Sequence, residues 1–374
     1  MEAGGEKPIM INEQRLVSSF VELARIDSLS GQEQAVGERV MDALRALGAE
    51  VERDGIGNVF GRLPGRGEPL LLNAHMDTVG PVGNIQPVLS EGVIRSDGRT
   101  ILGADDKAGI AVILEAAQTA LERGLPLPPL DILFTVQEEV GLCGAKAFDT
   151  SRLRAKEGIG LDTGGPPGTV AVAAPTHDVL KAVIHGIAAH AGAEPEKGIS
   201  AIVVAAEAIT RMPLGRIDEE TTANIGLING GRALNIVPDL AEVRGEARSR
   251  DKAKLEAQVR RMVGAFEEAA AHHGARVEVE VNREYTGFRL TPDEPIIRLL
   301  ARGAAEVGLE PSYIETGGGS DANIFNAAGV RIVNISCGMQ QVHTTSEQIA
   351  VADMVRTAEW LLACLRLKAS AQAD

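Results

Sequence analysis

The sequence predicts a layered α/β domain that is interrupted by a smaller inserted module. Three observations support this fold class. Short apolar runs alternate with amphipathic helical segments in the first and last parts of the 374-residue chain. The runs are continuous rather than alternating, which is typical of strands buried on both faces of a sheet. Between these parts the elements follow the order β-α-β-β-α-β, a known self-contained two-layer unit.

Two helices are expected to open the α/β domain. One face of the first helix carries apolar residues spaced i, i+4 and i+7: Leu16, Phe20 and Leu23. The second helix is expected to begin at a capping box formed by Ser30 and Glu33 and to end before Gly48. A long helix is expected over residues 107–123. Buried strands are expected at four apolar runs: residues 70–72, 130–136, 159–161 and 331–335.

The inserted module is expected at residues 177–287. Its strands are expected at residues 179–187, 222–228, 240–247 and 276–281, and its helices at residues 199–212 and 252–273. After the module, helix resumes at residues 292–307. The chain is therefore expected to form a discontinuous domain, residues 10–176 plus 288–374, and one inserted domain, residues 177–287.

Composition and charge exclude several classes of partner. The chain carries 37 Lys and Arg against 52 Asp and Glu, a formal charge of -15, so no nucleic-acid partner is expected. Apolar runs such as residues 110–114 are far too short to span a bilayer. Residues 1–8 have no apolar run, so we expect no targeting segment there and expect these residues to form a disordered tail. We therefore expect a cytoplasmic protein without a membrane partner.

Five short motifs place metal-ligating side chains at strand ends or loops of the α/β domain. In chain order they are H-x-D at 75–77, D-x-K-x-G at 105–109, E-E-x-G at 138–141, Asp162 after an apolar run, and His343 before the last helix. Each motif alone has an ordinary explanation, such as a solvated strand end or acidic residues at a helix N-terminus. Together they supply two His and three or four carboxylates. That is a ligand set for two borderline-hard divalent ions, with zinc the first choice.

Two of the motifs also contain side chains suited to roles other than ligation. His75 and Asp77 are two residues apart and project to the same side of an extended backbone. A metal-bound imidazole needs its second nitrogen hydrogen-bonded, and a carboxylate at this position can do that. Glu138 and Glu139 close an apolar strand, where sites in α/β sheets assemble. One of them can bind metal while the other stays free as a base.

All five motifs, in this order and spacing, resemble the co-catalytic di-zinc metallopeptidase family of peptidase T, aminoacylase, bacterial glutamate carboxypeptidase and succinyl-diaminopimelate desuccinylase. The resemblance covers nearly the whole chain, and the segment at residues 103–109 is most similar to the peptidase T branch. It implies a zinc-exopeptidase-like layered α/β catalytic domain that holds two divalent metal ions, zinc first. It also implies that the βαββαβ insertion is a ferredoxin-like lid or dimerisation domain.

The resemblance assigns a role to each motif residue. The five metal ligands would be Asp105, bridging both ions, His75 and Asp162 at one ion, and Glu139 and His343 at the other. Asp77 would orient His75, and Glu138 would act as the general base. The peptide bond between Asp105 and Asp106 would be cis.

The resemblance also assigns substrate contacts around the insertion. His190 would stabilise the oxyanion in the partner subunit's site. The alternative interpretation is that His190 is a histidine of a surface loop without this role. Asn235 and Arg248 would hold the scissile carbonyl region and the substrate carboxylate, which a guanidinium fork matches. The alternative for Arg248 is a solvated basic edge. Gly318 and Gly319 would contact substrate through their amides, or belong to a plain glycine loop.

These implications describe a zinc-dependent exopeptidase of small peptides, an aminopeptidase of the tripeptidase type, that forms a homodimer through residues 177–287. Metal-activated water would attack the amide while Glu138 takes its proton. Asp162 favours this specificity, because aminopeptidase and dipeptidase branches tend to carry Asp there and carboxypeptidase and deacylase branches Glu. The alternatives are an N-acyl amino-acid amidohydrolase or a carboxypeptidase on the same site. A remoter alternative, an inactive binding protein, is opposed by the intact ligand set.

Overall fold

The chain divides into two compact units. The computed structural model describes residues 11–370, and the tail expected at residues 1–8 lies outside this range. Unit 1 comprises the residues up to Val172, Arg289–Glu315 and the residues from Ser320 onward. Unit 2 comprises Ala173–Phe288 and Thr316–Gly319. No helix in the described range is long and apolar enough to cross a membrane.

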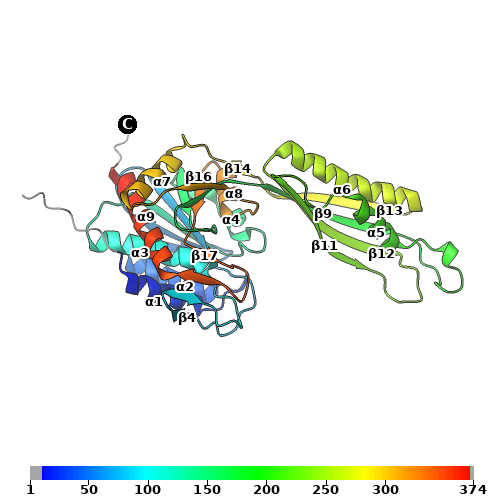
Figure 1. Ribbon diagram of the computed structural model, residues 1–374, viewed down its shortest axis with the longest axis horizontal. Coiled ribbons are helices and arrows are strands. Elements are labelled where there is room, and N and C mark those ends of the chain that lie inside the picture. The colour runs from blue at the N-terminus through cyan, green and yellow to red at the C-terminus, as the bar shows by residue number, and fades with distance from the viewer. Residues whose placement is uncertain (1–10, 371–374) are drawn as a thin grey trace, which may run out of the picture. The chain divides into compact units, whose positions relative to one another are not determined.

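Unit 1 is built around a nine-stranded mixed sheet (Figure 1). Its strand order is β1 (Glu50–Arg53), β2 (Val59–Leu63), β6 (Leu130–Thr135), β3 (Leu70–His75), β7 (Glu157–Gly160), β16 (Arg331–Ile335), β8 (Thr169–Ala174) and β14 (Phe288–Arg289), with β15 (Ser312–Glu315) paired to β8. The central strands β6, β3, β7 and β16 are parallel, whereas β2 and β8 join them antiparallel. The four apolar runs of the sequence lie at these central strands, as expected for a sheet covered on both faces.

Helices of unit 1 form a contiguous layer in which α1, α3 and α9 contact one another and α7 packs on α9 (Figure 1). The helices of this unit are α1 (Glu13–Ala24), α2 (Gln34–Ala46), α3 (Ala104–Glu122), α4 (Cys143–Ala147), α7 (Pro295–Glu306), α8 (Asp321–Ala327) and α9 (Val351–Ser370), with a short 3-10 helix at Thr150–Arg152. Phe20 of α1 and Trp360 of α9 are fully buried in this layer. The helix α3 packs on β3 and so carries its N-terminal end to the edge of the sheet.

The capping box expected at the start of the second helix does not form. The hydroxyl of Ser30 donates instead to the carboxylate of Asp77 at 2.6 Å. The carboxylate of Glu33 accepts hydrogen bonds from the backbone N–H groups of Gly31 and Gln137, at 2.8 and 2.9 Å. The prediction was wrong because both side chains bind loops that are distant in sequence, which a local spacing pattern does not reveal.

A small second sheet of unit 1 was not expected from the sequence. Its strand order is β17 (Met339–Gln340), β18 (Gln348–Ala350), β5 (Val93–Arg95) and β4 (Val88–Ser90). The strands are two or three residues long, too short for a clear hydrophobic pattern. The loop between β17 and β18 carries His343.

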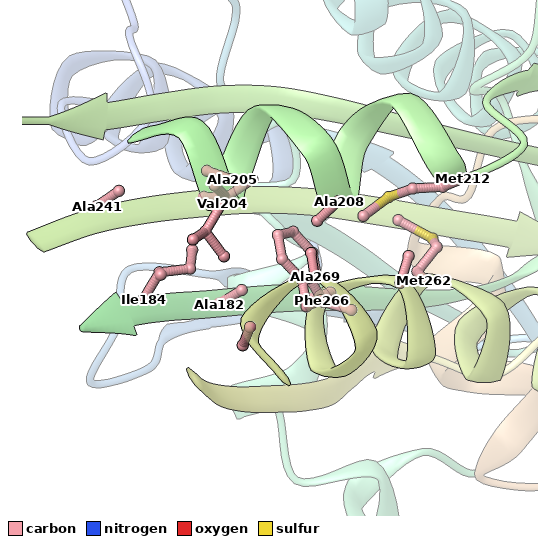
Figure 2. Close-up of a cluster of buried hydrophobic side chains, with 14 of the residues drawn as sticks. Ala182, Ile184, Val204, Ala205, Ala208, Met212, Ala241, Met262, Phe266 and Ala269 are labelled. Carbon is pink, nitrogen blue, oxygen red and sulfur yellow. The ribbon is translucent and has the colours of Figure 1, made fainter. Parts of the chain in front are cut away.

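Unit 2 has the expected β-α-β-β-α-β order, with one short strand added. Its antiparallel sheet has the order β10 (Gly215–Arg216), β11 (Thr221–Gly230), β12 (Leu240–Ser249), β9 (Thr176–His185) and β13 (Arg276–Tyr285). Two helices, α5 (Ala201–Arg211) and α6 (Lys252–His273), pack on this sheet, and a 3-10 helix lies at Pro195–Lys197. Figure 2 shows their buried core, in which Val204 and Ala208 of α5 lie near Phe266 and Ala269 of α6.

Candidate metal centre

The side chains predicted to bind metal come from segments of unit 1 that follow parallel strands or lie in adjoining loops. They are His75 at the end of β3, Glu139 after β6, Asp162 after β7, Asp105 at the start of α3, and His343 between β17 and β18. Because parallel strands deliver the residues that follow them to the same edge of a sheet, segments far apart in sequence meet there.

The carboxylate of Asp105 faces two histidines. Its Oδ1 lies 3.1 Å from Nε2 of His75, and its Oδ2 lies 3.2 Å from Nε2 of His343. Nε2 of His343 also lies 2.9 Å from Oε1 of Glu139. The peptide bond between Asp105 and Asp106 is cis. Each oxygen of Asp105 is therefore directed to a different group of candidate ligands.

Two groups of three candidate ligands share Asp105. Among the described residues, donor atoms of His75, Asp105 and Asp162 lie within 4.8 Å of one another, and so do those of Asp105, Glu139 and His343. The structure thus brings all five side chains together. Two nitrogen donors and three carboxylates in overlapping groups are a donor set that suits two borderline-hard divalent ions. Their action as ligands remains a prediction.

The electrostatics of the cluster also fit positive charge at its centre. Burial and the neighbouring charge of Asp105 raise the pKa of Asp162 to about 8. Burial and the charge of Asp162 raise the pKa of Glu138 well above its usual value. Hydrogen bonds with Asp105 and Glu139 raise the pKa of His343 to about 10. Bound cations would favour the charged form of these crowded carboxylates, so the cluster suits metal ions.

Asp77 is fully buried and connects His75 to the glutamate pair. Nδ1 of His75 lies 2.9 Å from the backbone oxygen of Asp77 and 3.4 Å from its Oδ1. The carboxylate of Asp77 accepts hydrogen bonds from the backbone N–H groups of Glu138 at 2.9 Å and Glu139 at 3.2 Å, as well as from Ser30. Asp77 therefore holds the backbone of both glutamates in addition to contacting the imidazole ring.

Two further residues of the D-x-K-x-G motif, Lys107 and Gly109, have a structural explanation. Nζ of the buried Lys107 donates to the backbone oxygen of Ile26 at 2.6 Å, and burial lowers the pKa of Lys107 to about 7. Asp106 is fully buried, and burial raises the pKa of its carboxyl well above the usual value. A Cβ at Gly109 would lie 2.3 Å from Oδ1 of Asp106 and 2.8 Å from Cβ of Leu161. Glycine therefore allows α3 to lie close to the end of β7.

Glu347 is a buried residue of the site that the sequence analysis did not single out. Its Oε2 accepts hydrogen bonds from the backbone N–H groups of Leu102 and Gly103, both at 2.7 Å, and its Oε1 accepts one from Asp105 at 3.1 Å. The side chain thereby joins the loop of His343 to the start of α3. The only cue in the sequence is an acidic residue four positions after His343.

Unit 2 brings two of the predicted substrate residues, Arg248 and Gly319, into contact with Tyr285. Nη1 of Arg248 lies 3.4 Å from the hydroxyl of Tyr285, and its guanidinium also pairs with Glu246 at 2.9 and 3.2 Å. A Cβ at Gly319 would lie 2.2 Å from the ring of Tyr285, so the ring packs directly on this glycine. Gly318 precedes it, and its amide donates within the same loop. Tyr285 was not predicted, since an aromatic residue at a strand end has no distinctive spacing.

The structure places His190 and Asn235 next to each other in a different part of unit 2. The backbone oxygen of Asn235 accepts a hydrogen bond from the N–H of Ala191 at 3.0 Å. Nδ1 of His190 accepts from the N–H groups of Gly192 and Ala193, both at 3.1 Å. A neutral ring must then carry its proton on Nε2. His190 is exposed, so this nitrogen is available as a donor.

These two groups of unit 2 lie at opposite ends of its sheet. His177 of β9 pairs with Arg248, whereas His185, eight residues further along β9, pairs with Leu240 and precedes the loop of His190. Eight residues of strand span ~26 Å. Within one copy of unit 2, the Arg248 group and the His190 group are therefore too far apart to contact the same short peptide.

Sequence comparison places the chain in a known family. The family model described as peptidase family M20/M25/M40 matches residues 71–367, which include all five candidate ligands. The chain belongs to this peptidase family. It is 44% identical over 367 residues to the uncharacterised protein YqjE of Bacillus subtilis, covering 95% of this chain and 99% of that protein.

Solved structures of similar proteins support the peptidase T branch of this family. The aminopeptidase PepT of Bacillus cereus ATCC 10987 is 43% identical with a TM-score of 0.88, covering 96% of this chain and 100% of that chain. A tripeptidase of Staphylococcus aureus subsp. aureus Mu50 is 39% identical with a TM-score of 0.91, covering 96% and 99%. The predicted α/β fold with its insertion, the family resemblance and the assignment as a peptidase are thereby confirmed.

Proposed function

We propose that this peptidase is a zinc-dependent exopeptidase of small peptides, specifically an aminopeptidase of the tripeptidase type. The observation that carries the proposal is the carboxylate of Asp105, which lies between His75 and His343 with one oxygen toward each. The similarity to an aminopeptidase and a tripeptidase over nearly the whole chain supports the choice of substrate class.

We assign the two ions to the two groups of side chains that share Asp105. His75 and Asp162 would complete one site, and Glu139 and His343 the other. When bound, such ions lower the pKa of a water molecule and polarise the scissile carbonyl. Imidazole and carboxylate donors in this combination make zinc the first choice of metal.

Glu138 is proposed to move the protons of the reaction. Its backbone is held by Asp77, and its side chain is nine-tenths buried beside the candidate ligands. Burial disfavours its charged form, so a proton taken from the attacking water can be held and then given to the leaving amine. The adjacent Glu139 contacts His343 and is assigned to ligation instead.

Unit 2 is proposed to bind the peptide. The guanidinium of Arg248 matches a peptide carboxylate, and Glu246 and Tyr285 hold its orientation. The loop of Gly318 and Gly319 would contact the peptide backbone, and Gly319 lies against Tyr285. The Nε2–H of His190 is suited to donate to the oxyanion.

We further propose a homodimer through residues 177–287, in which His190 and Asn235 complete the partner's site. The supporting observation is the separation of ~26 Å along β9 between the two groups of predicted substrate residues. An extended tripeptide reaches only ~10 Å. Two copies related by a twofold axis can present the Arg248 group of one chain and the His190 group of the other to one peptide.

Substrate profiling tests the proposed activity. The zinc-loaded enzyme is incubated with matched di-, tri- and N-acetylated tripeptides, and products are identified by mass spectrometry. The proposal expects release of the N-terminal residue from tripeptides with a free amine, and strongly reduced cleavage of the acetylated forms. Preferential hydrolysis of the N-acyl bond would instead identify an amidohydrolase, and release of the C-terminal residue a carboxypeptidase.

A further inference from the structure

We propose that unit 2 contains a separate binding site for a divalent transition-metal ion, formed by Glu207 of α5 and by His272 and His273 at the end of α6. Their donor atoms lie within 4.8 Å of one another. None of these residues belongs to the candidate catalytic cluster, which lies in unit 1.

The two imidazole rings converge on one carboxylate. Nδ1 of His272 lies 2.9 Å from Oε1 of Glu207, and Nε2 of His273 lies 2.6 Å from Oε2. Adjacent helical residues point about 100° apart. The rings nevertheless meet because His272 uses the nitrogen near its backbone and His273 the nitrogen at the tip of its ring. Their centroids are 4.8 Å apart, with ring planes inclined by 56°.

The hydrophobic core of unit 2 fixes the spacing of the two helices that carry these side chains. Figure 2 shows Ala208 on α5 and Phe266 and Ala269 on α6, all members of the same buried cluster. Glu207 directly precedes Ala208, and His273 lies one helical turn beyond Ala269. An ion held by Glu207 and His273 would therefore cross-link α5 to α6 without moving either helix.

The donor set selects the class of metal. Two imidazole nitrogens and one carboxylate oxygen bind zinc at about 2.0–2.2 Å, and imidazole favours Zn²⁺, Ni²⁺ and Cu²⁺ over Mg²⁺ and Ca²⁺. The side chain of His272 is 63% exposed, whereas those of His273 and Glu207 are 29% and 20% exposed. The exposed side of the site admits the ion from solvent and leaves its remaining coordination positions to water.

Arg211 competes with a metal ion for the carboxylate of Glu207. Its guanidinium contacts Oε1 of Glu207 and lies 3.9 Å from Oε2 of Glu268. Arg211 therefore has a second acidic partner when the metal occupies Glu207. Replacing Arg211 by Ala should strengthen metal binding, because the carboxylate would lose its competing cation.

The test uses Ni²⁺ as the probe and full-length enzyme that carries zinc at the catalytic cluster only. Equilibrium dialysis followed by metal analysis counts both nickel and zinc, so exchange at the catalytic cluster is detected as lost zinc. We expect wild type to bind about one Ni²⁺ per chain with unchanged zinc, and thermal unfolding to shift to higher temperature as Ni²⁺ is added. His273→Ala and Glu207→Gln should lose both effects.

Two variants control the experiment. His185→Ala removes another histidine of unit 2, 3.6 Å from Glu278 and outside the proposed site, and should retain nickel binding. Arg211→Ala should bind nickel several-fold more tightly than wild type. Equal nickel binding by wild type, His273→Ala and Glu207→Gln would overturn the proposal. It would also be overturned if neither wild type nor Arg211→Ala bound nickel without losing zinc.

Discussion

The carboxylate of Glu347 accepts a hydrogen bond from the backbone N–H of Asp105 at 3.1 Å, across 242 positions of the sequence. It also accepts hydrogen bonds from the N–H groups of Leu102 and Gly103, and it is 1% exposed. Glu347 therefore fixes the short segment that presents Asp105, while its own loop carries His343. One buried side chain positions both halves of the candidate metal centre.

Glu347→Gln should weaken metal binding without removing any proposed ligand. Glutamine keeps one acceptor oxygen, but its NH₂ group would face a backbone donor. Loss of a partner outside the ligand set typically costs about 10–100-fold in metal affinity or activity. Metal content after dialysis against graded chelator concentrations measures the effect. Glu310→Gln, at an exposed position, is the matched control and should behave as wild type.

Substitutions at the glutamate pair should separate the base from the ligand. Glu138→Gln should keep about two metal ions per chain and lose about 10²–10⁴-fold in kcat, because only proton transfer is removed. Glu139→Gln should lose metal instead, since Glu139 contacts His343 at 2.9 Å. Metal analysis and steady-state kinetics on both variants show which glutamate is the base and which is the ligand. Near-normal kcat in Glu138→Gln would refute the assignment of the base.

Mixing two inactive variants should restore activity if the site is shared between subunits. Glu138→Gln and His190→Ala chains are combined under conditions of demonstrated subunit exchange. Half of the dimers are then hybrids with one intact composite site, so activity should recover to about a quarter of wild type. If the chains exchange and no activity returns, His190 does not act in the partner's site.

Gly319→Ala should impair peptide binding more than Gly318→Ala. A Cβ at Gly319 would lie 2.2 Å from the ring of Tyr285, whereas the nearest atom to a Cβ at Gly318 is 3.7 Å away. Overpacking of this kind costs about 1–3 kcal/mol and should displace Tyr285 from Arg248. We expect a raised KM for tripeptides in Gly319→Ala only. Equal KM values in the two variants would contradict the role of this contact.

The ion pair of Glu246 should make part of the stability of unit 2 pH-dependent. Hydrogen bonds to His177 and Arg248 lower the pKa of Glu246 to about 2, below its ordinary 4.5. A lowered folded-state pKa contributes stability above pH 4.5 that is lost as the pH falls toward 2. The free energy of unfolding, measured with urea, should therefore be higher for wild type than for Glu246→Gln at pH 6. This difference should be smaller at pH 3. If the difference in the free energy of unfolding were the same at both pH values, the ion pair of Glu246 would not be its cause.

The sequence by itself determined the local features of this protein. Continuous apolar runs predicted the buried parallel strands, and the helix expected at residues 252–273 is α6 (Lys252–His273). Motif spacing identified the side chains that now surround Asp105. These features could be predicted because hydrophobic periodicity and residue chemistry can be recognised within a short segment of sequence.

Only the tertiary structure decided which distant groups act together. The order β6-β3-β7-β16 is not the chain order, so strand pairing sets which loops meet at the sheet edge. Ser30 matched a helix cap in sequence but binds Asp77, and Glu347 binds the start of α3. The pairing of β13 with β9 places Tyr285 opposite His177, and its ring lies against Gly319. Buried polar groups form hydrogen bonds with the groups that lie next to them in the folded chain. Which groups these are depends on the packing of the whole chain.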